Sequence, residues 1–523
     1  MRVFEKNLLA LEAISPGLAQ TLRQLEDRGV KTDRRLLAAR TGHLYAVELE
    51  SAYNPHREYE LKMAAELERL SGVPLLVGFL SGAQVEVALR HLEQVDLVVL
   101  DVSLFVRCLQ EAELGFDVGR VRQVFLFDER NAVVAAFSRL GEAVYNDRFL
   151  ILNPRYLEGI QASLGGFRLW LKRLLQGKPS LLFVSPITGG SFNIARYLHL
   201  AAQSLGFPAI LQDNRGLETQ HAKLLEGDDP VETQAFFDRL TEESLRAISQ
   251  HQIDVLIGVS QSPLPERLVR TARKAGVLCV YWFIENHRLF RHYRDIVHLY
   301  DRFFVIQGSG LLKELREQGH RHAGYLPMAC MPGIHRPLAL GPDERLQFGA
   351  AVSFMGSAYA NRIRFFEKLV PDLQRDFKLW GTHWGDSPVL TPYHQKTPES
   401  YLSDETIVKI YNASAINLNH HSDDQDGSHL DYLNPRAFEI PACGGFQLID
   451  RRDELASLFA PDEVVAYDNL EDLRRRIAYF SIHPDERNAL SDRARKRVLR
   501  EHTYEMRLAQ MLDTSGSTRV RIG

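Results

Sequence analysis

The amino-acid sequence predicts an α/β protein built from parallel sheets, and three observations lead to this fold class. Short apolar runs rich in β-branched residues alternate with longer amphipathic segments along most of the chain, as in successive βαβ units. Hydrophobic residues make up 45% and charged residues 25% of the sequence, which is typical of globular proteins and excludes disordered or fibrous ones. At about 100–200 residues per domain, the 523 residues suggest about three domains.

The charge, hydropathy and cysteine patterns narrow the classes of function. The net charge of −4 at pH 7 argues against a dedicated nucleic-acid binder and against a polybasic membrane anchor. No apolar run approaches the ~18 residues that span a bilayer, and residues 1–13 lack a signal-peptide pattern. The four cysteines form no CxxC pair, so we expect reduced, mostly buried thiols. These patterns predict a cytoplasmic protein with no transmembrane segment and no nucleic-acid partner.

The first predicted block covers residues 1–158. After helical segments, a strand at 73–79 leads through a loop with Gly78 and Gly82 into a helix, and the next strand ends near Asp101. A glycine loop, a helix and a following acid resemble a nucleotide-binding βαβ unit, but GxxxG is not the GxGxxG fingerprint. The glycines are explained as well by a tight turn.

The second predicted block covers residues 175–338. A buried strand at 181–186 is followed by a loop with Gly189 and Gly190 and by an amphipathic helix. Further strand candidates begin at Pro208, Asp254, Val277 and Arg302. A proline-rich linker around residue 332 marks the end of the block.

The third predicted block covers residues 345–512 and repeats the alternation of strands and helices. Strand candidates begin at Ala350, Phe377, Ala415, Gly445 and Glu463. One amphipathic helix is predicted over residues 485–512. Two successive α/β blocks of similar length predict two doubly wound domains that face each other.

The most specific motif is DYLNPRAFEIPACGGFQLID, at residues 431–450. Asp431 and Glu439 are eight residues apart, and Asn434 precedes a short helix that ends at Gly444. Ligands of doubly wound sheets bind at the carboxyl ends of strands, beside helix N-termini. We therefore expect a phosphate near this helix and carboxylates that accept hydrogen bonds from ribose or other polyol hydroxyls.

This motif and five further pieces resemble the CgeB-like (spore-maturation type) glycosyltransferases over residues 350–512. The pieces occur in the order VSFMGSAYANR, LWGTHW, YNASAINLN, LNPRAFEIPACGGFQLID, VVAYDNLEDLRRRI and REHTYEMR. The second block is similar to the same family in YWFIENHRLF, LKELREQG and GYLPMAC. The resemblance implies a GT-B fold, with two facing Rossmann-like domains at 175–338 and 345–512. An additional α/β domain precedes them here.

The resemblance also implies a nucleoside-diphosphate sugar as co-substrate, with no cofactor. Glu439 matches the carboxylate expected on the donor ribose. Asp431 takes the place of the upstream acid in the E-x7-E pattern and is expected to act as a catalytic residue facing the donor sugar. Aspartate has a shorter reach than the glutamate that many relatives carry there. Asn434, Arg436 and Gly444 complete the donor-binding residues expected around this motif.

Other residues of the third block are candidates for donor contacts on physical grounds. Gly356 and Ser357 end its first strand, where the backbone can approach a pyrophosphate closely. Arg362, in the following helix, can pair with phosphate, or it is an ordinary surface arginine. Trp380 ends the next strand and is expected to border the nucleotide base, with a core tryptophan as the alternative.

The acceptor side of the site is predicted in the second block. Gly189 and Gly190 form a loop that admits an acceptor or a phosphate oxygen, unless the loop only caps a helix. His287 follows a strand and is predicted as a catalytic group that faces the cleft. Glu285 is a neighbouring candidate, and a structural histidine is the alternative. No catalytic base is assigned, and a retaining transfer would need none.

The acid-x-acid element at 423–426 is the remaining candidate for a metal site. Such acids hold a bridging metal in another glycosyltransferase fold, whereas GT-B enzymes stabilise the leaving diphosphate with a helix dipole and basic groups. His420, His421 and His429 add no regular ligand spacing. We therefore predict no metal site.

Residues in the first block loosely resemble the motility-accessory-factor (Maf) type of protein, which is linked to flagellin glycosylation in bacteria. The resemblance rests on FEKNLLALEAISPGLAQTL, SAYNPHREYELKMA, LLVGFLSGAQVEVALRHL and VVLDVS. It implies an accessory domain that recruits the acceptor, a protein such as flagellin or a surface glycan.

The sequence thus predicts a glycosyltransferase that moves a sugar from a nucleoside-diphosphate sugar to a glycan or protein acceptor. The main alternative is a non-catalytic scaffold of GT-B shape that binds a nucleotide or glycan in a glycosylation complex. A sugar-nucleotide epimerase is a third reading, and it differs in needing no acceptor.

Overall fold

The computed structural model describes most of residues 178–513 and several segments before them. The described ranges are 3–12, 19–20, 22–23, 36–37, 45–46, 75–77, 82–99, 105–106, 109–110, 116–126, 149–151, 178–227, 229–308, 310–373, 376–397, 402–422 and 432–513. The chain forms two compact units, Met1–Pro179 and Ser180–Gly523.

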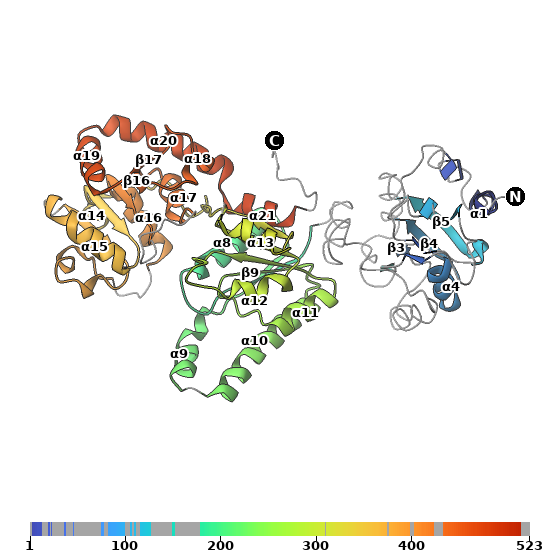
Figure 1. Ribbon diagram of the computed structural model, residues 1–523. Helices are drawn as coiled ribbons and strands as arrows, with labels where there is room; N and C mark the ends of the chain where they lie inside the picture. Colours follow the sequence, from blue (N-terminus) through green and yellow to red (C-terminus); the bar gives the residue numbers. More distant parts are fainter. Residues whose placement is uncertain are drawn as a thin grey trace. The chain divides into compact units, whose positions relative to one another are not determined.

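The N-terminal unit contains a four-stranded parallel sheet in the order β5-β4-β3-β6 (Figure 1). Leu76 and Leu97 of this sheet are fully buried and share one core with helices α1 and α4. The predicted α/β class is therefore confirmed for this unit, whereas Gly78 and Asp101 lie outside the described residues. The elements are α1 (Val3–Glu12), β1 (Leu36–Leu37), β2 (Tyr45–Ala46), β3 (Leu75–Val77), α4 (Gly82–His91), β4 (Val95–Val99), β5 (Val121–Leu126) and β6 (Phe149–Ile151).

The first sheet of the second unit has six parallel strands in the order β12-β11-β10-β9-β7-β8. The first strand in the chain, β7, lies between β8 and β9. The next strand, β8, is added on one side of β7 and the later strands on the other side, so the strand order reverses beside β7. Such a switch point is where ligands bind in doubly wound sheets. The strands are β7 (Leu181–Val184), β8 (Ala209–Gln212), β9 (Val255–Val259), β10 (Leu278–Phe283), β11 (Arg302–Val305) and β12 (Ala323–Tyr325).

Helices flank this sheet (Figure 1). Helix α8 begins directly after the loop that contains Gly189 and Gly190, and its apolar side chains, such as Leu198, are buried. Asp229 caps the long helix α10, because its side chain accepts hydrogen bonds from two free backbone N–H groups. The helices are α8 (Ser191–Ser204), α9 (Glu218–Gly227), α10 (Pro230–Gln250), α11 (Glu266–Lys274), α12 (Tyr293–Ile296) and α13 (Gly310–Glu317).

The second sheet of this unit has five parallel strands in the order β14-β13-β15-β16-β17. Its first strand, β13, again lies beside the switch point, between β14 and β15. Both predicted sets of strands are thus found in parallel sheets. The elements are α14 (Pro342–Phe348), β13 (Val352–Met355), α15 (Ala360–Leu369), β14 (Phe377–Trp380), α16 (Asp404–Ala413), β15 (Ile416–Asn419), α17 (Arg436–Ala442), β16 (Gln447–Asp450), α18 (Leu455–Leu458), β17 (Val465–Tyr467), α19 (Leu470–Ser481), α20 (Pro484–Glu501) and α21 (Tyr504–Leu512).

The end of the chain departs from the predicted single helix, which is divided into α20 and α21. Thr503 accepts a hydrogen bond from the Met506 N–H and so starts a new helix, and the Tyr504 N–H donates to the Cys330 carbonyl. Helix α21 then packs against α8 of the first sheet. Two parallel, doubly wound sheets joined in this way have the GT-B architecture, which confirms the predicted fold class.

Two further observations concern the described part of the chain. Cys279, Cys330 and Cys443 are free and buried, as predicted, while Cys108 lies outside the described residues. Within the described ranges, no helix combines the length and the apolarity needed to cross a membrane.

Candidate functional site

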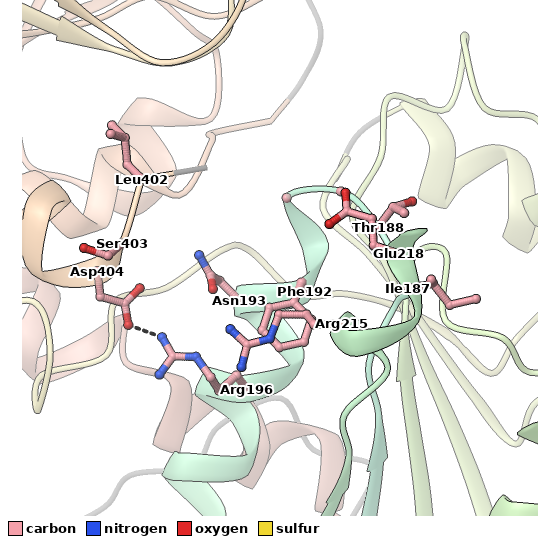
Figure 2. A pocket seen from close by; sticks show the side chains of 12 residues that line it. Ile187, Thr188, Phe192, Asn193, Arg196, Arg215, Glu218, Leu402, Ser403 and Asp404 are labelled. Atoms are coloured by element: carbon pink, nitrogen blue, oxygen red, sulfur yellow. Dashed lines mark hydrogen bonds and ion pairs between the residues drawn. The ribbon is translucent and has the colours of Figure 1, made fainter. Parts of the chain in front are cut away.

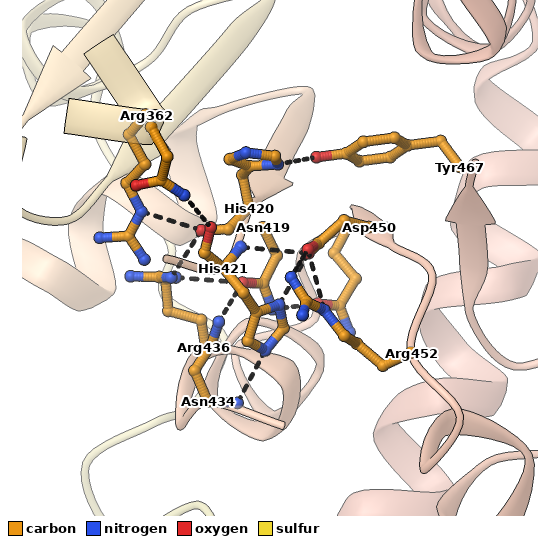
Figure 3. Close-up of polar contacts among 11 residues, drawn as sticks. Arg362, Asn419, His420, His421, Asn434, Arg436, Asp450, Arg452 and Tyr467 are labelled. Atoms are coloured by element: carbon orange, nitrogen blue, oxygen red, sulfur yellow. Dashed lines mark hydrogen bonds and ion pairs between the residues drawn. The ribbon is translucent and has the colours of Figure 1, made fainter. Parts of the chain in front are cut away.

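Two arginines lie side by side at the switch point of the second sheet (Figure 3). The His420 carbonyl, just after β15, accepts a hydrogen bond from Arg362 Nε at 3.1 Å and from Arg436 Nη2 at 3.2 Å. A second carbonyl holds each group, Ser357 for Arg362 and Met355 for Arg436, both at 3.0 Å. Both guanidinium groups also lie over the ring of Phe354. The structure thus brings together Ser357, Arg362 and Arg436, three of the residues predicted around the donor.

The arginine pair keeps its positive charge in this environment. Carbonyl groups orient a guanidinium but carry no net charge, and no carboxylate pairs with Arg362 or Arg436 among residues 178–513 as described. Arg362 is 5% exposed, and burial together with the neighbouring Arg436 lowers its pKa to about 9. A bound anion would relieve this repulsion, so the pair favours a polyanionic ligand.

Gly356, which follows β13, leaves the space that Arg436 occupies. A Cβ atom at this position would lie 2.7 Å from Arg436 Nη1 and 3.1 Å from the ring of Phe354. Gly381, at the end of β14, packs equally closely, since a Cβ there would lie 2.5 Å from the Gly356 carbonyl oxygen. Gly356 therefore allows the close packing of Arg436 against the end of β13.

A chain of side-chain amides fixes the orientation of Asn434. Gln447 Nε2 donates to the Ala437 carbonyl, so its Oε1 accepts from Asn419 Nδ2. Asn419 Oδ1 then accepts from Asn434 Nδ2 at 2.8 Å and from Arg436 Nε at 3.2 Å. Asn434 Oδ1 is left buried and unpaired within the described part of the chain. The amide chain therefore positions Arg436 and leaves one acceptor atom beside it.

A buried network of His421, Asp450 and Arg452 supports the same edge of the sheet (Figure 3). His421 Nδ1 donates to Asp450 at 2.7 Å, and His421 Nε2 accepts from the Asn434 N–H at 3.0 Å. Arg452 forms an ion pair with Asp450. Burial lowers the pKa of His421 to about 4. Although burial opposes ionisation, His421 and Arg452 hold the pKa of Asp450 well below its usual range.

The His421 network joins residues on either side of positions 423–431, which lie outside the described residues. His421 precedes this segment and Asn434 follows it. Asp431, the predicted catalytic residue, falls within it, as do Asp423, Asp424 and Asp426. The structural role of His421 was not predictable from the sequence, which presents His420 and His421 only as unlikely metal ligands. A histidine that orients other side chains has no distinctive spacing.

Glu439 lies on α17, one turn after Arg436, and its carboxylate is buried with weak partners. Tyr411 Oη donates to Oε2 at 3.4 Å, and His335 Nε2 lies 3.8 Å from Oε1, beyond hydrogen-bond distance. Burial raises the pKa of Glu439 to about 7, against the opposing effect of Arg436. Such a carboxylate has acceptor capacity left for ligand hydroxyls.

The predicted glycine loop of the first sheet lines a cavity of about 430 Å³. Gly189 and Gly190 form part of its wall, and Asp404, at the start of α16, closes it from the side of the second sheet (Figure 2). Asp404 forms an ion pair with Arg196 and accepts a hydrogen bond from Tyr197 Oη at 2.7 Å. The cavity thus lies between residues of the two sheets.

At the end of β10, Glu285 reaches the glycine loop and its surroundings. Glu285 Oε1 accepts hydrogen bonds from Ser191 Oγ and Gln261 Nε2, both at 3.3 Å. His287, the predicted catalytic residue, is half-buried in the turn that follows. Glu285, which the sequence marked only as a neighbouring candidate, therefore contacts the first residue of α8, directly after the loop at Gly189 and Gly190.

Two predicted donor contacts are placed differently from the expectation. Trp380 is 4% exposed and its ring stacks against Phe348 at 6.0 Å, so it has the position of a core residue. Gly444 follows the C-terminal end of α17, whereas Arg436 begins that helix. Gly444 is therefore at the opposite end of the helix from the arginine pair, and its position argues against a donor contact.

No cluster of three or more potential metal-binding side chains occurs in the ranges that the structure describes. The acids at 423–426 are outside these ranges. The positive charge available at the described site comes from Arg362 and Arg436.

Comparisons with known proteins show what the second unit is similar to. The family model described as "Glycosyl transferase-like" matches residues 362–513, which include Arg362, Arg436 and Glu439. The spore protein CgeB of Bacillus subtilis is 22% identical over 278 residues, which are 51% of this chain and 84% of that protein.

Two solved structures are examples of what the chain is similar to. Sucrose-phosphate synthase from Thermosynechococcus elongatus is 12% identical, covers 64% of this chain and 97% of its own, and has a TM-score of 0.44. The Anabaena protein HepE in complex with UDP-glucose is 11% identical, covers 64% and 98%, and also has a TM-score of 0.44. The chain therefore contains a glycosyl transferase-like domain whose matched residues include the arginine pair, and it is similar in sequence to the spore protein CgeB.

Proposed function

We propose that this protein transfers a glycosyl group from a nucleoside-diphosphate sugar to an acceptor. The observation that carries the proposal is the charged arginine pair, Arg362 and Arg436, whose hydrogen-bond partners among the described residues are carbonyl and amide oxygens at a switch point. A diphosphate offers two adjacent anionic groups, which match two adjacent guanidinium groups. The glycosyl transferase-like domain over residues 362–513 supports the same reaction class.

The neighbouring side chains suit the rest of such a donor. The carboxylate of Glu439, which has few hydrogen-bond partners, accepts hydrogen bonds from the ribose hydroxyls. Asn434 Oδ1 accepts one from a hydroxyl of the sugar or the ribose. In the reaction, the two arginines stabilise the negative charge that develops on the leaving diphosphate. Because these cations come from the chain, we propose that transfer needs no divalent metal, and activity should persist in the presence of EDTA.

The first experiment is a thermal-shift panel of UDP-, GDP-, TDP- and CMP-linked sugars, followed by calorimetry. A donor at about 100 times its Kd should stabilise the protein by about 2.7 kcal/mol. Arg436→Lys should raise the Kd by about 10–100-fold, because charge-assisted hydrogen bonds contribute about 1.5–3 kcal/mol. The matched control is Arg474→Lys, a half-buried arginine on α19 that pairs with Asp372, and this variant should bind the donor like the wild type.

The outcomes separate the competing functions. Absence of any shift in a folded sample, or an unchanged Kd in Arg436→Lys, would remove the donor assignment. Binding without release of nucleotide from a labelled donor would favour the non-catalytic scaffold. Conversion of the sugar without an acceptor would favour an epimerase.

We further propose that the N-terminal unit recruits the acceptor. It has its own parallel sheet and its own core, so it is built as a separate module. A protein acceptor such as flagellin should be retained by the full chain on an affinity column. If the full chain glycosylates a free glycan but retains no flagellin, flagellin is not the acceptor. The proposed glycosyl transfer would still stand.

A further inference from the structure

We infer that Glu285 takes the proton from the acceptor hydroxyl, a role that rests on the glycosyl transfer proposed above. Three neighbouring strands of the first sheet end at one place. Gly189 follows β7, Gln261 follows β9 and Glu285 follows β10, and β7 and β9 flank the switch point of this sheet. The same glycine lines the 430 Å³ cavity. The carboxylate therefore lies beside the crevice where this half of the fold binds ligands.

The contacts of Glu285 hold a carboxylate in place without neutralising it. Its Oε1 accepts hydrogen bonds from the uncharged groups of Ser191 and Gln261, both at 3.3 Å. Its backbone carbonyl accepts from Gln307 Nε2 at 2.8 Å, which fixes the chain behind the side chain. No ion pair to Glu285 is found in the described residues, so its basicity is not reduced by a cation.

Two residues close to Glu285 have a positive φ angle, which is energetically unfavourable for a residue with a side chain. Gln261 has a φ of 69°, a left-handed conformation that is rare for a residue with a side chain. Gly189 has a φ of 91°, and a Cβ there would lie 2.8 Å from Gln261 Oε1. This conformation places the Gln261 amide between the glycine loop and Glu285. Strain of this kind concentrates at functional sites.

The chemistry of a transfer step assigns Glu285 a defined role. The acceptor oxygen forms a bond to the anomeric carbon while the bond from that carbon to the diphosphate oxygen breaks. The electron pair of the broken bond leaves with the diphosphate, which Arg362 and Arg436 hold. The hydroxyl proton moves to Glu285, and burial raises the pKa of this carboxyl, as befits a proton acceptor near neutral pH.

Water replaces the unidentified acceptor in the test. The readout is the release of nucleotide from whichever nucleotide sugar the wild type binds. Glu285→Gln should lower this hydrolysis at least about 100-fold, since a general base contributes about 10²–10⁴-fold, and it should leave the Kd for the donor unchanged. Glu266→Gln is the matched control, because Glu266 is exposed and pairs with Arg270 across one helical turn.

The pH profile distinguishes a base from a structural carboxylate. A base acts only when ionised, so hydrolysis should fall on the acid side of the Glu285 pKa, and this fall should be absent in Glu285→Gln. The Ser191 hydrogen bond lowers the pKa of Glu285, so Ser191→Ala should move the fall to higher pH. Tyr281, the titratable neighbour on β10, has its pKa raised by burial and stays neutral. His287→Asn should retain the fall.

Each outcome decides the assignment. Hydrolysis unchanged in Glu285→Gln, an acid fall that persists there, or an acid fall lost in His287→Asn would overturn it. A wild type that binds donor but never releases nucleotide would overturn it too. If no nucleotide sugar binds, the proposed function itself fails, and that failure is separate from one confined to Glu285.

Discussion

At the scale of single residues, Gly356 is the position on which the arginine pair most directly depends. In Gly356→Ala the new Cβ would lie 2.7 Å from Arg436 Nη1, and the guanidinium would have to leave its carbonyl partners. We expect a loss of about 1–3 kcal/mol in the free energy of unfolding, typical of overpacking, and a donor affinity reduced at least 10-fold. Urea unfolding and calorimetry measure the two effects.

The control for this substitution is Gly385→Ala in the same half of the unit. A Cβ at Gly385 would meet no atom within 4 Å, so stability and affinity should match the wild type. Equal effects of the two alanines would show that close packing of Gly356 against Arg436 is unimportant.

Glu439 should make stability depend on pH near neutrality. Its pKa is raised to about 7 in the folded state, so folding is favoured most at low pH and this contribution is lost as the pH rises through 7. Glu439→Gln has no carboxylate to ionise. Between pH 5 and pH 8 the variant should gain about 2–3 kcal/mol relative to the wild type. Urea unfolding at several pH values gives the comparison.

An exposed carboxylate provides the reference for Glu439. Glu471→Gln changes a side chain that is 72% exposed, and its stability should follow the wild-type pH curve. Parallel curves for Glu439→Gln and the wild type would mean that Glu439 ionises normally in the folded protein.

For single residues, the sequence predicts a place in the candidate site when the residue belongs to a short, recognisable motif. The sequence predicts Asn434, Arg436 and Gly356 around one ligand, and the structure places Arg436 against Gly356 and close to Asn434, since both side chains donate to Asn419. The orientation of Arg436 was not predictable, because its carbonyl partners on β13 and after β15 are far away in the chain. From the sequence, His287 is a stronger catalytic candidate than Glu285, since residue type alone favours histidine as a catalytic group.

At the scale of elements, Asp450 ties the end of β16 to the residues that precede α17. Asp450→Asn would leave Arg452 without its charged partner in the interior and weaken the bond to His421. Breaking a buried ion pair from one side typically costs about 3–5 kcal/mol, and we expect a loss of this size in urea unfolding followed by circular dichroism.

An exposed ion pair gives the comparison for Asp450. Asp462→Asn removes the partner of Arg493 where both side chains face solvent, and the expected loss is below about 1 kcal/mol. A similarly small loss for Asp450→Asn would show that the His421 network does not hold this edge of the sheet.

Strands were easier to predict than helix ends. The buried runs at β9 and β10 are apolar on both faces, which distinguishes central parallel strands from amphipathic helices. The break between α20 and α21 was missed because the amphipathic pattern continues across it. The break depends on Thr503 as a cap and on the Cys330 carbonyl, which is remote in sequence.

At the scale of the whole second unit, Asp404 joins the two sheets. It accepts hydrogen bonds from Tyr197 and Arg196 of α8, while it belongs to α16. Asp404→Ala should therefore increase backbone hydrogen exchange at the start of both helices, although they belong to different sheets. Exchange followed by mass spectrometry reports each helix separately.

The adjacent residue is a matched control for Asp404. Glu405→Ala removes a side chain that is 74% exposed and pairs with Lys409 on its own helix, so exchange in α8 should not change. An increase confined to α16 in Asp404→Ala would indicate a local effect on that helix and no coupling between the sheets.

The sequence predicted two facing α/β domains, but not how the chain connects them. Arg507, which is 2% exposed, donates to the carbonyls of Pro327 and Met328 and so fastens α21 to the linker between the sheets. The contacts of a buried arginine with backbone carbonyls have no sequence signature, because any residue offers a carbonyl.

A carbonyl cage that orients two guanidinium groups without cancelling their charge attracts any compact polyanion. If the proposed donor binds at Arg362 and Arg436, inorganic phosphate, pyrophosphate and free nucleotides should compete with it there. Occupancy then follows the ratio of donor to competitors, so phosphate buffers would mask ligands in a binding screen. The nucleoside diphosphate released by each turnover would be a competitor as well. Sustained transfer would thus require a second activity that removes this product.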